Sequence, residues 1–269
     1  MSAPPESLVS TLAESRRAGR LMAKFPTTVL LEPDSAYDLQ IQLNAAVGGT
    51  VVGWKIGCTN AWAQQLTGTD EPFYGRMHEE TTFDSPADLA GLAFASPIVE
   101  PEIAFRFHRD LTPAEAPFTL RQVLDATAAL APAIEVVDCR FEGGWSPTLA
   151  ETIVDNGVHA CFVAGSWRSD WADIDRLGLT VAVTVNGESV TDGVGANALD
   201  DPANALLWLA NRVTGRGETL HAGDIVTTGN IANAAVHAKP GDHAVCDFGP
   251  LGRVEATFRQ GDADPERTE

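Results

Sequence analysis

Three glutamates, Glu100 and Glu102 in IVEPEIAFRF and Glu135 in PAIEVVDCRF, stand inside apolar stretches that predict buried β-strands. In the first stretch Ile103 and Phe105 keep a period of two, so the two glutamates share the opposite face, with roughly 7 Å between their Cα atoms. Glu135 lies between two apolar residues and therefore also points away from its neighbours. The pattern predicts a set of carboxylates on buried strands.

Buried carboxylates need a partner, because removing anions from water without compensation is very costly. If these carboxylates converge, they must bind a cation or keep protons. A hard divalent metal with oxygen ligands fits best, and the glutamates would leave about three positions of an octahedral magnesium shell for water or substrate. Glu100 and Glu102 alone would better suit an edge strand that alternates glutamate with apolar residues. Glu135 on an adjacent strand favours a catalytic metal site.

The composition indicates a globular chain, since 269 residues with 44% apolar content can bury a full core. A formal charge of -19 argues against a nucleic-acid partner, because phosphate binding depends on clustered Lys and Arg. No apolar run reaches the roughly 18–20 residues of a membrane span and no signal pattern is present, so we expect a cytoplasmic protein without a membrane partner.

The cysteines have no metal or redox spacing, and we expect reduced core residues at Cys58, Cys139, Cys161 and Cys246.

Two helices are predicted before the first strand. Leu8, Leu12 and Leu21 have helical spacing within SLVSTLAESRRAGRLMAKF. The segment SAYDLQIQLNAAV predicts a second helix, capped at Ser35. We therefore divide the chain into an N-terminal helical segment packed on the core (1–48), a β-rich catalytic domain (49–259) and a disordered acidic tail (260–269).

Short β-like runs separated by Gly, Pro and Asp turns dominate the rest of the chain, from TVVGWKIG onward. The helices predicted between them are TLRQVLDATAALA up to Pro132, SPTLAETIVDN ending near Gly157, and DPANALLWLANRVTGRG with Asp201 as its N-cap. The dipeptide Asn186-Gly187 between two β runs is typical of a type I′ hairpin. Because strands outnumber helices and do not alternate regularly with them, we predict an α+β fold with a mixed, curled sheet, not a doubly wound parallel sheet.

The order and spacing of several short motifs resemble one branch of a known enzyme superfamily. Along the chain they read GWKIGCT, EPFYG, VEPEIAF, PAIEVVDCRF, ETIVDN, DPANALLWLA, GDIVTTG and PGDHAVCDFGPLGRV. Together, from about Leu39 to Phe258, they are similar to the 2-keto-4-pentenoate hydratase and 4-oxalocrotonate decarboxylase branch of the fumarylacetoacetate hydrolase superfamily. The resemblance implies that superfamily's mixed, curled β-sheet core and assembly at least to a homodimer.

The same resemblance implies an activity. A divalent metal, magnesium or manganese, would be held by Glu100, Glu102 and Glu135, and a 2-keto acid would chelate it through its keto oxygen and one carboxylate oxygen. The ion would stabilise the enolate of a small unsaturated 2-keto acid. We interpret the chain as a metal-dependent lyase of the 2-keto-4-pentenoate hydratase type. The alternatives are a decarboxylase of 4-oxalocrotonate type, a C–C bond hydrolase of acylpyruvate type, and a member that keeps the scaffold without catalysis.

The resemblance also implies roles for residues around the metal. Lys55 in GWKIG matches a lysine near the metal, where desolvation would lower its pKa and suit it to proton transfer. Asp155 and Asn156 in ETIVDN would orient a water or a metal ligand. Thr228 and Gly229 stand where relatives have a Thr-Gly turn near the substrate. We expect all of these residues to surround one catalytic cavity.

Two departures from the family pattern bear on the acid-base groups. Hydratases usually read P-D-F-G where this chain reads P-F-Y-G, so Phe73 replaces an aspartate implicated in proton transfer. His78, Glu79 or Tyr74 could supply the missing base, and Arg76 could pair with a distal substrate carboxylate, although a solvated loop and a structural salt bridge are the simpler interpretations. His159 in DNGVHACF replaces a small residue and would be either an acid or base or a satisfied buried histidine.

Overall fold

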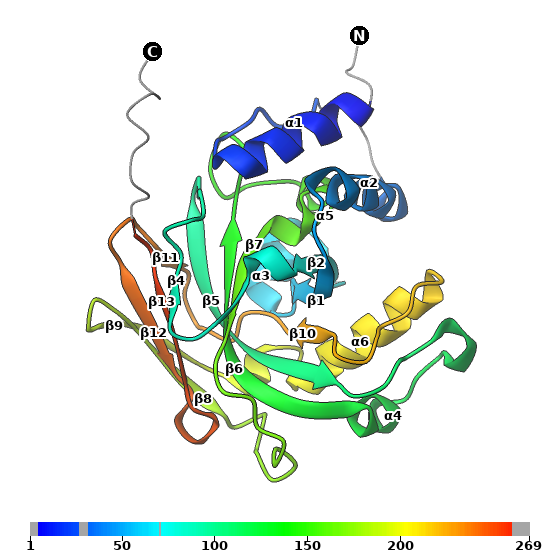
Figure 1. The fold of residues 1–269 in the computed structure, drawn as a ribbon, viewed down its shortest axis with the longest axis vertical. Coiled ribbons are helices and arrows are strands. Elements are labelled where there is room, and N and C mark those ends of the chain that lie inside the picture. The colour runs from blue at the N-terminus through cyan, green and yellow to red at the C-terminus, as the bar shows by residue number, and fades with distance from the viewer. Residues whose placement is uncertain (1–4, 27–31, 70, 260–269) are drawn as a thin grey trace.

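The larger of two β-sheets forms the body of the molecule and curls into a half-barrel (Figure 1). The computed structural model describes residues 5–26, 32–69 and 71–259. In spatial order the sheet contains β2 (Phe73–His78), β1 (Val51–Gly57), β10 (Ile225–Thr227), β5 (Pro97–Phe107), β6 (Thr127–Asp138), β7 (His159–Ala164) and β3 (Thr82–Asp84), and β11 (Val236–His237) pairs with β5.

The smaller sheet lies beside β5 and β6 in Figure 1. Its strands are, in order, β4 (Ala87–Asp88), β13 (Arg253–Thr257), β12 (His243–Asp247), β8 (Thr180–Val185) and β9 (Glu188–Val194). Among the strands of the described residues, β1 with β10, β3 with β7 and β4 with β13 pair in parallel, and the other pairs are antiparallel. This mixture confirms the predicted α+β fold with a mixed, curled sheet.

The predicted hairpin joins β8 to β9. Asn186 and Gly187 have φ values of 53° and 84°, and a type I′ turn requires a positive φ at both central positions. Glycine and asparagine tolerate this conformation better than other residues, which is why the dipeptide was informative in the sequence.

The two longest strands, β5 and β6, pair antiparallel along almost their whole length. The prediction of one helix over residues 119–131 is wrong in its second half. Thr119 caps a short helix, α4 (Leu120–Asp125), and the alanine-rich run from Thr127 onward belongs to β6. Alanine favours helix, but pairing with β5 in the centre of the sheet, where Leu130 and Ala131 are fully buried, outweighs that propensity.

Helices α1 (Pro5–Ala18) and α2 (Pro33–Val47) lie at one end of the half-barrel, where α2 packs against α5 (Leu149–Val154) (Figure 1). Leu8 and Leu12 of α1 are buried in the main core, but Leu21 lies beyond the helix and is 52% exposed. The predicted cap at Ser35 is wrong, because α2 begins at Pro33 with Glu32 as its N-cap. The predicted tail (260–269) and parts of the predicted helical segment (1–4 and 27–31) fall outside the described residues.

Helix α6 (Pro202–Gly215) begins as predicted, with the Asp201 carboxylate accepting a hydrogen bond from the Ala203 N–H at 2.8 Å. Its buried Leu206 belongs to the same apolar core as Phe105 on the outer face of the half-barrel.

The remaining helical elements are α3 (Ala61–Thr67), η1 (Glu79–Thr81), η2 (Pro113–Glu115), η3 (Asn156–Val158), η4 (Gly195–Asn197) and η5 (Gly249–Leu251). None of the helices in the described ranges is long and apolar enough to cross a membrane. All cysteines are buried and form no disulfide, as predicted.

Candidate metal centre and active site

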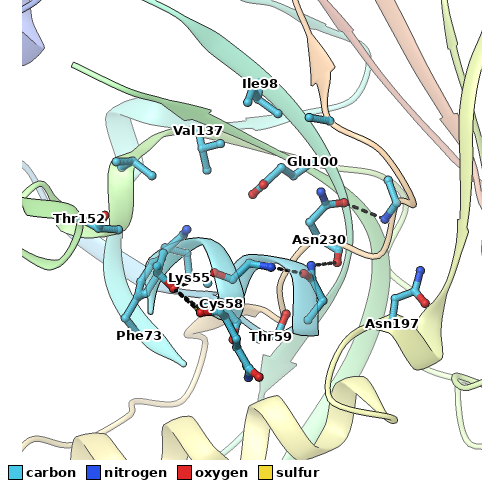
Figure 2. Close-up of a pocket in the computed structure, with 18 of the residues that line it drawn as sticks. Lys55, Cys58, Thr59, Phe73, Ile98, Glu100, Val137, Thr152, Asn197 and Asn230 are labelled. Atoms are coloured by element: carbon cyan, nitrogen blue, oxygen red, sulfur yellow. Dashed lines mark hydrogen bonds between the residues drawn. The ribbon is translucent and has the colours of Figure 1, made fainter. Parts of the chain in front are cut away.

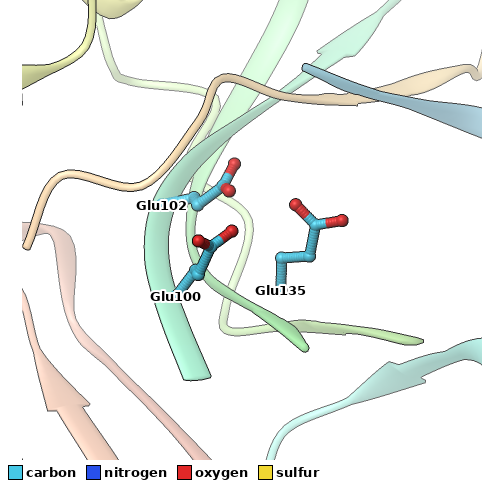
Figure 3. Close-up of side chains that lie close together, drawn as sticks. All are labelled: Glu100, Glu102 and Glu135. Carbon is cyan, nitrogen blue, oxygen red and sulfur yellow. The ribbon is translucent and has the colours of Figure 1, made fainter. Parts of the chain in front are cut away.

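The predicted convergence of the glutamates is present on the inner face of the half-barrel (Figure 3). Glu100 of β5 pairs directly with Glu135 of β6, and Glu102 is the next residue on the same face of β5. One carboxylate oxygen from each glutamate lies within 4.8 Å of the others. Ile103 and Phe105 point to the outer face and join the main core, as the period of two predicts.

Glu102 is fixed by two donors at the end of β10. The Thr227 hydroxyl donates to Oε2, and the Gly229 N–H donates to the same oxygen at 2.6 Å. The other oxygen, Oε1, is buried and has no hydrogen-bond partner among the described residues. A buried, orphaned carboxylate oxygen beside two further carboxylates is a donor set that suits a hard divalent cation. The residues present therefore fit the predicted metal.

Without a cation, burial favours the protonated forms of these carboxylates, and repulsion by Glu135 adds to the effect at Glu100 and Glu102. Burial raises the pKa of Glu100 to about 8, and the charge of Glu135 adds to the effect. The pKa of Glu102 is raised well above its usual range by the same two causes, and burial also raises the pKa of Glu135. A metal must displace protons from this cluster to bind near neutral pH.

Lys55 of β1 supplies a cation beside the cluster. Its side chain is buried, with Nζ 3.3 Å from Glu135 Oε2 and 3.0 Å from the Gly157 carbonyl oxygen, to which it donates. Burial acts to lower the Lys55 pKa, but the charges of the three glutamates act against it and leave the pKa above its ordinary value. The predicted lowering of this pKa is therefore wrong for the metal-free site, where Lys55 is an ammonium that offsets carboxylate charge.

A left-handed turn at residues 156–158 carries the carbonyl that accepts from Lys55, with φ values of 56°, 66° and 54°. The Asn156 side chain ties this turn to β2, because Nδ2 donates to the Arg76 carbonyl and Oδ1 accepts from the Arg76 N–H, both at 2.7 Å. Gly75 permits the close approach, since a Cβ there would lie 2.2 Å from the Asn156 carbonyl oxygen. Asn156 therefore positions Lys55 through the backbone and does not itself line the cavity.

Asp155 lies behind the site, and the structure does not bring it to the cavity. Its buried carboxylate binds Arg16 of α1, with Nη1 2.7 Å from Oδ1, and Arg140, with Nη1 3.2 Å from Oδ2. Arg16 also donates to the His159 carbonyl at 2.8 Å. The structure does not place Asp155 where it was predicted to orient a water or a metal ligand, and its carboxylate instead anchors α1 against the half-barrel.

His159 contacts the metal cluster from behind. Its Nδ1 lies 2.7 Å from Glu135 Oε1, and the ring is buried. Burial, followed by the charge of Lys55, lowers the His159 pKa well below its usual range. The ring is thus neutral, and a hydrogen bond to a carboxylate then requires the proton on Nδ1. Of its two predicted roles, the buried histidine is the one that the geometry supports, with the added effect of orienting Glu135.

Phe73 presents an apolar wall to the lysine at the position where an aspartate was expected. The Lys55 Nζ lies 5.4 Å from the ring centroid of Phe73. Two glycines leave room for this ring, because a Cβ on Gly57 would lie 2.4 Å from it and a Cβ on Gly157 3.3 Å from it.

Three other residues with predicted roles lie on β2, and their side chains point to the face opposite that of Phe73. Tyr74 stacks on Tyr37 with ring centroids 4.3 Å apart, and Arg76 forms an ion pair with Glu218. His78 is buried, and burial is the main cause that lowers its pKa to about 4. None of the three side chains, Tyr74, Arg76 and His78, lines the cavity, so the structure does not bring them to the candidate site. Each alternates with Phe73 or Gly75 along the strand.

The predicted Thr-Gly turn contacts the glutamate cluster through the Gly229 N–H and not through the Thr228 side chain. The Thr228 hydroxyl donates to the Ile103 carbonyl at 2.8 Å, away from the cluster. Thr227, which sequence reasoning missed, lies beside Lys55 in the β1–β10 pair and binds Glu102. The period of two was the available signal, because it places Thr227 and Gly229 on one face.

A cavity of about 960 Å³ opens from the cluster (Figure 2). The Glu100 carboxylate lies in the middle of the view, with Ile98 and Val137 on one side and Lys55 and Phe73 on the other. Through Glu100 the cavity reaches the glutamate cluster, and it places the lysine and an apolar wall beside it, as an enzyme site for a small molecule requires.

Residues 77–259, more than half of the chain, match the family described as Fumarylacetoacetate (FAA) hydrolase C-terminal. The chain belongs to the fumarylacetoacetate hydrolase family. A 2-keto-4-pentenoate hydratase of Paraburkholderia xenovorans is 32% identical over 257 residues, which are 94% of each chain. A 4-oxalocrotonate decarboxylase of Pseudomonas sp. (strain CF600) is 34% identical over 228 residues, which are 83% of this chain and 84% of that relative.

Solved structures of the fumarylacetoacetate hydrolase family give the same assignment. The 4-oxalocrotonate decarboxylase from Pseudomonas putida G7, complexed with magnesium and adipate, superposes with a TM-score of 0.84 at 28% identity, over 96% of this chain and 100% of that one. A fumarylpyruvate hydrolase from Pseudomonas aeruginosa, at 12% identity and a TM-score of 0.56, shares the fold. The chain is an enzyme of the hydratase and lyase type, and its glutamate cluster is the candidate site for a divalent metal.

The raised carboxylate pKa values predict how metal binding by this family member depends on pH. A carboxylate whose pKa is raised on folding stabilises the metal-free protein below its unfolded pKa, and that stability is lost as the pH rises through the folded pKa, about 8 for Glu100. We therefore expect the rise in melting temperature caused by magnesium, relative to EDTA, to grow from pH 6 to pH 9. Metal affinity should increase roughly tenfold per pH unit for each proton displaced.

Thermal unfolding across this pH range, with and without magnesium, checks the expectation. The Glu100→Gln variant is the comparison, because an amide has no proton to lose: we expect a smaller magnesium-induced rise and a shallower pH dependence than in the unmodified protein, since Glu102 and Glu135 still titrate. A magnesium-induced rise that stays constant or shrinks with increasing pH would contradict the assignment of the raised pKa values to the metal cluster.

Proposed function

We propose that this enzyme is a magnesium-dependent lyase that hydrates a small unsaturated 2-keto acid, in the manner of the 2-keto-4-pentenoate hydratases. The observation that carries the proposal is the convergence of Glu100, Glu102 and Glu135 beside Lys55, with Glu100 and Lys55 lining a cavity. The glutamates would hold the ion, with manganese as the natural substitute for magnesium. A bound divalent ion would offset the negative charge that develops on the 2-keto oxygen.

Lys55 is the residue best placed to move a proton. Its Nζ is held between the Gly157 carbonyl and Glu135, so the ammonium stays beside the carboxylates at the cavity wall. There it can donate a proton to a substrate carbon or balance enolate charge. Phe73 covers one side of the ammonium with an apolar ring, which keeps water away from it. We assign the proton-transfer role of the expected aspartate to Lys55.

A decarboxylase of 4-oxalocrotonate type is the second candidate. A relative with that name is 34% identical, and a structure with that name superposes over 96% of the chain. An acylpyruvate-type hydrolase has less support, because it needs a base to activate water. The predicted histidines, His78 and His159, do not line the cavity, and His237 does so only at the exposed rim. Assembly as a homodimer or a larger homo-oligomer stays a prediction.

Substrate assays distinguish these candidates. Protein freed of metal with EDTA and then supplied with magnesium would be offered 2-hydroxypenta-2,4-dienoate, 4-oxalocrotonate and an acylpyruvate. Loss of the conjugated chromophore in the ultraviolet follows turnover, and mass spectrometry identifies the product. We expect magnesium-dependent loss of the dienoate with a product heavier by one water. Release of carbon dioxide from 4-oxalocrotonate alone would favour the decarboxylase, and no metal-dependent turnover of any substrate would overturn the lyase proposal.

A further inference from the structure

The inner face of the half-barrel carries its side chains in layers along β5 and β6. Glu100 pairs with Glu135, and the next pair toward the mouth of the cavity is Ile98 with Val137. Residues two apart on a strand point to the same face, roughly 7 Å along it, so this apolar pair adjoins the carboxylate pair. Ile98 and Val137 are 6% and 2% exposed, and both line the cavity.

The opposite end of the inner face is closed. Beyond Glu102, β5 presents Ala104, which packs with Ala133 of β6 in a separate apolar cluster that also contains Met77, Phe162, Ala164 and Ile225. The members of this cluster are at most 7% exposed, and none of them lines the cavity. A molecule held at the glutamates therefore cannot extend in this direction and must extend toward the mouth.

Two further side chains complete an apolar wall at the mouth. Val158 and Trp145 pack with Ile98 and Val137 in a third apolar cluster, and both line the cavity. The indole of Trp145 is anchored, because its Nε1 donates to the Ser96 carbonyl at 3.1 Å. The wall is thus formed from strand and turn residues that are fixed by their own packing.

The facing wall is polar and includes the Thr59 hydroxyl, which has no hydrogen-bond partner among the described residues, but it offers no lysine or arginine to neutralise a second carboxylate. The amide groups of Gln64 and Asn197 donate to backbone carbonyls at 3.2 and 2.8 Å. Among the described residues that line the cavity, Lys55 is the one lysine or arginine, and the glutamates already match its charge. Asp200 adds a negative charge, and His237 lies at the exposed rim.

We propose that the substrate carries an uncharged hydrocarbon tail, longer than that of a five-carbon acid, which lies against Ile98, Val137 and Trp145. The inference rests on the proposed function, which puts the 2-keto acid end at the glutamates. A terminal carboxylate in this place would lose its hydration without a cation to replace it. The cavity of about 960 Å³ is near the upper end of the roughly 300–1,000 Å³ that hold drug-sized ligands, which leaves room for a larger tail.

Isothermal titration of the magnesium-loaded protein with three stable 2-oxo acids tests this specificity. Pyruvate reports chelation without a tail, whereas 2-oxohexanoate and 2-oxoadipate have equal chain lengths and end in a methyl group and a carboxylate, respectively. We expect 2-oxohexanoate to bind roughly 10-fold or more tightly than 2-oxoadipate, and more tightly than pyruvate. Equal or tighter binding of 2-oxoadipate would overturn the tail assignment alone. Failure of all three acids to bind would refute 2-keto acid chelation, and with it the proposed function.

Substitutions of Ile98 locate the preference on the apolar wall. Ile98→Lys adds a cation beside the tail, and Ile98→Met is its matched apolar control. We expect Ile98→Lys to bind 2-oxoadipate more tightly than 2-oxohexanoate, and Ile98→Met to keep the wild-type order. A folded Ile98→Lys protein, verified by circular dichroism, that keeps the wild-type order would overturn the placement of the tail.

If Ile98→Lys does not fold, Val137→Thr gives the same test with a smaller change, because threonine keeps the shape of valine and adds a hydroxyl group. We expect the ratio of 2-oxohexanoate affinity to pyruvate affinity to fall by roughly 3-fold or more. An unchanged ratio would overturn the contact between the tail and Val137.

Discussion

Replacing Glu102 by glutamine is expected to weaken magnesium binding by more than the roughly 10–100-fold that loss of an outer hydrogen-bond partner costs a metal site, and to reduce turnover at least as much. Glutamine keeps the size of the side chain and can still accept from Thr227 and Gly229. It removes the charge of a buried carboxylate whose Oε1 has no hydrogen-bond partner among the described residues. Titration of the metal-free variant with magnesium, together with steady-state kinetics, measures both effects.

The matched control is Glu79→Gln, because Glu79 is exposed and lies outside the cavity. The control should bind magnesium and turn over substrate as the unmodified protein does. If Glu102→Gln kept its metal affinity and activity while remaining folded, the assignment of the metal site to this cluster would be wrong.

The second large effect is expected for Lys55→Met, which should reduce turnover by roughly 10²–10⁴-fold, the usual contribution of a positioned proton donor or acceptor. Methionine fills the space of the lysine stem but cannot carry a proton. Magnesium binding at pH 8.5 should persist, because all three carboxylates stay in place and the cation that repels the ion is gone. Kinetics and calorimetric titration of the same preparation measure the two properties.

Lys239→Met is the control for this change, since Lys239 is exposed and does not line the cavity. Its kinetics should match those of the unmodified protein. If Lys55→Met lost magnesium binding and turnover together, Lys55 would be a structural support of the metal cluster, and the proton-transfer role would fall. Near-normal turnover would also remove that role.

The metal cluster could be predicted from the sequence because it depends on local periodicity. A period of two along residues 97–107 places Glu100 and Glu102 on one face, and Glu135 occupies the equivalent face of the strand paired with it. The single long-range step was that the two strands are neighbours. Strands that are close in the sequence often pair, and pairing of these two strands brings all three buried carboxylates together on one face.

The residues on β2 could not be placed, because their orientation depends on a partner strand. Alternation alone groups Tyr74, Arg76 and His78 on one face and Phe73 on the other, but it does not say which face looks inward. The register of β1 against β2, which pairs Lys55 with Gly75, decides this. Pairing between separate strands is set by tertiary packing and is weakly encoded in either strand by itself.

Asp155 shows a similar limit. Its carboxylate stands next to a motif that fits the family, yet its partners are Arg16, 139 residues earlier in the chain, and Arg140. Likewise, the run at 127–131 has helical propensity and becomes strand because it pairs with β5. In both cases contacts between distant segments outweigh the local signal.

The central claim is that Glu100, Glu102 and Glu135 together hold a divalent ion, on which the 2-keto acid chemistry depends. Anomalous diffraction from crystals soaked with manganese tests it most directly. We expect one strong anomalous peak per chain, within about 2.0–2.6 Å of an oxygen from each glutamate, the range of metal–oxygen distances for such ions. A peak at other residues, or manganese bound in solution with no peak at this cluster, would contradict the claim.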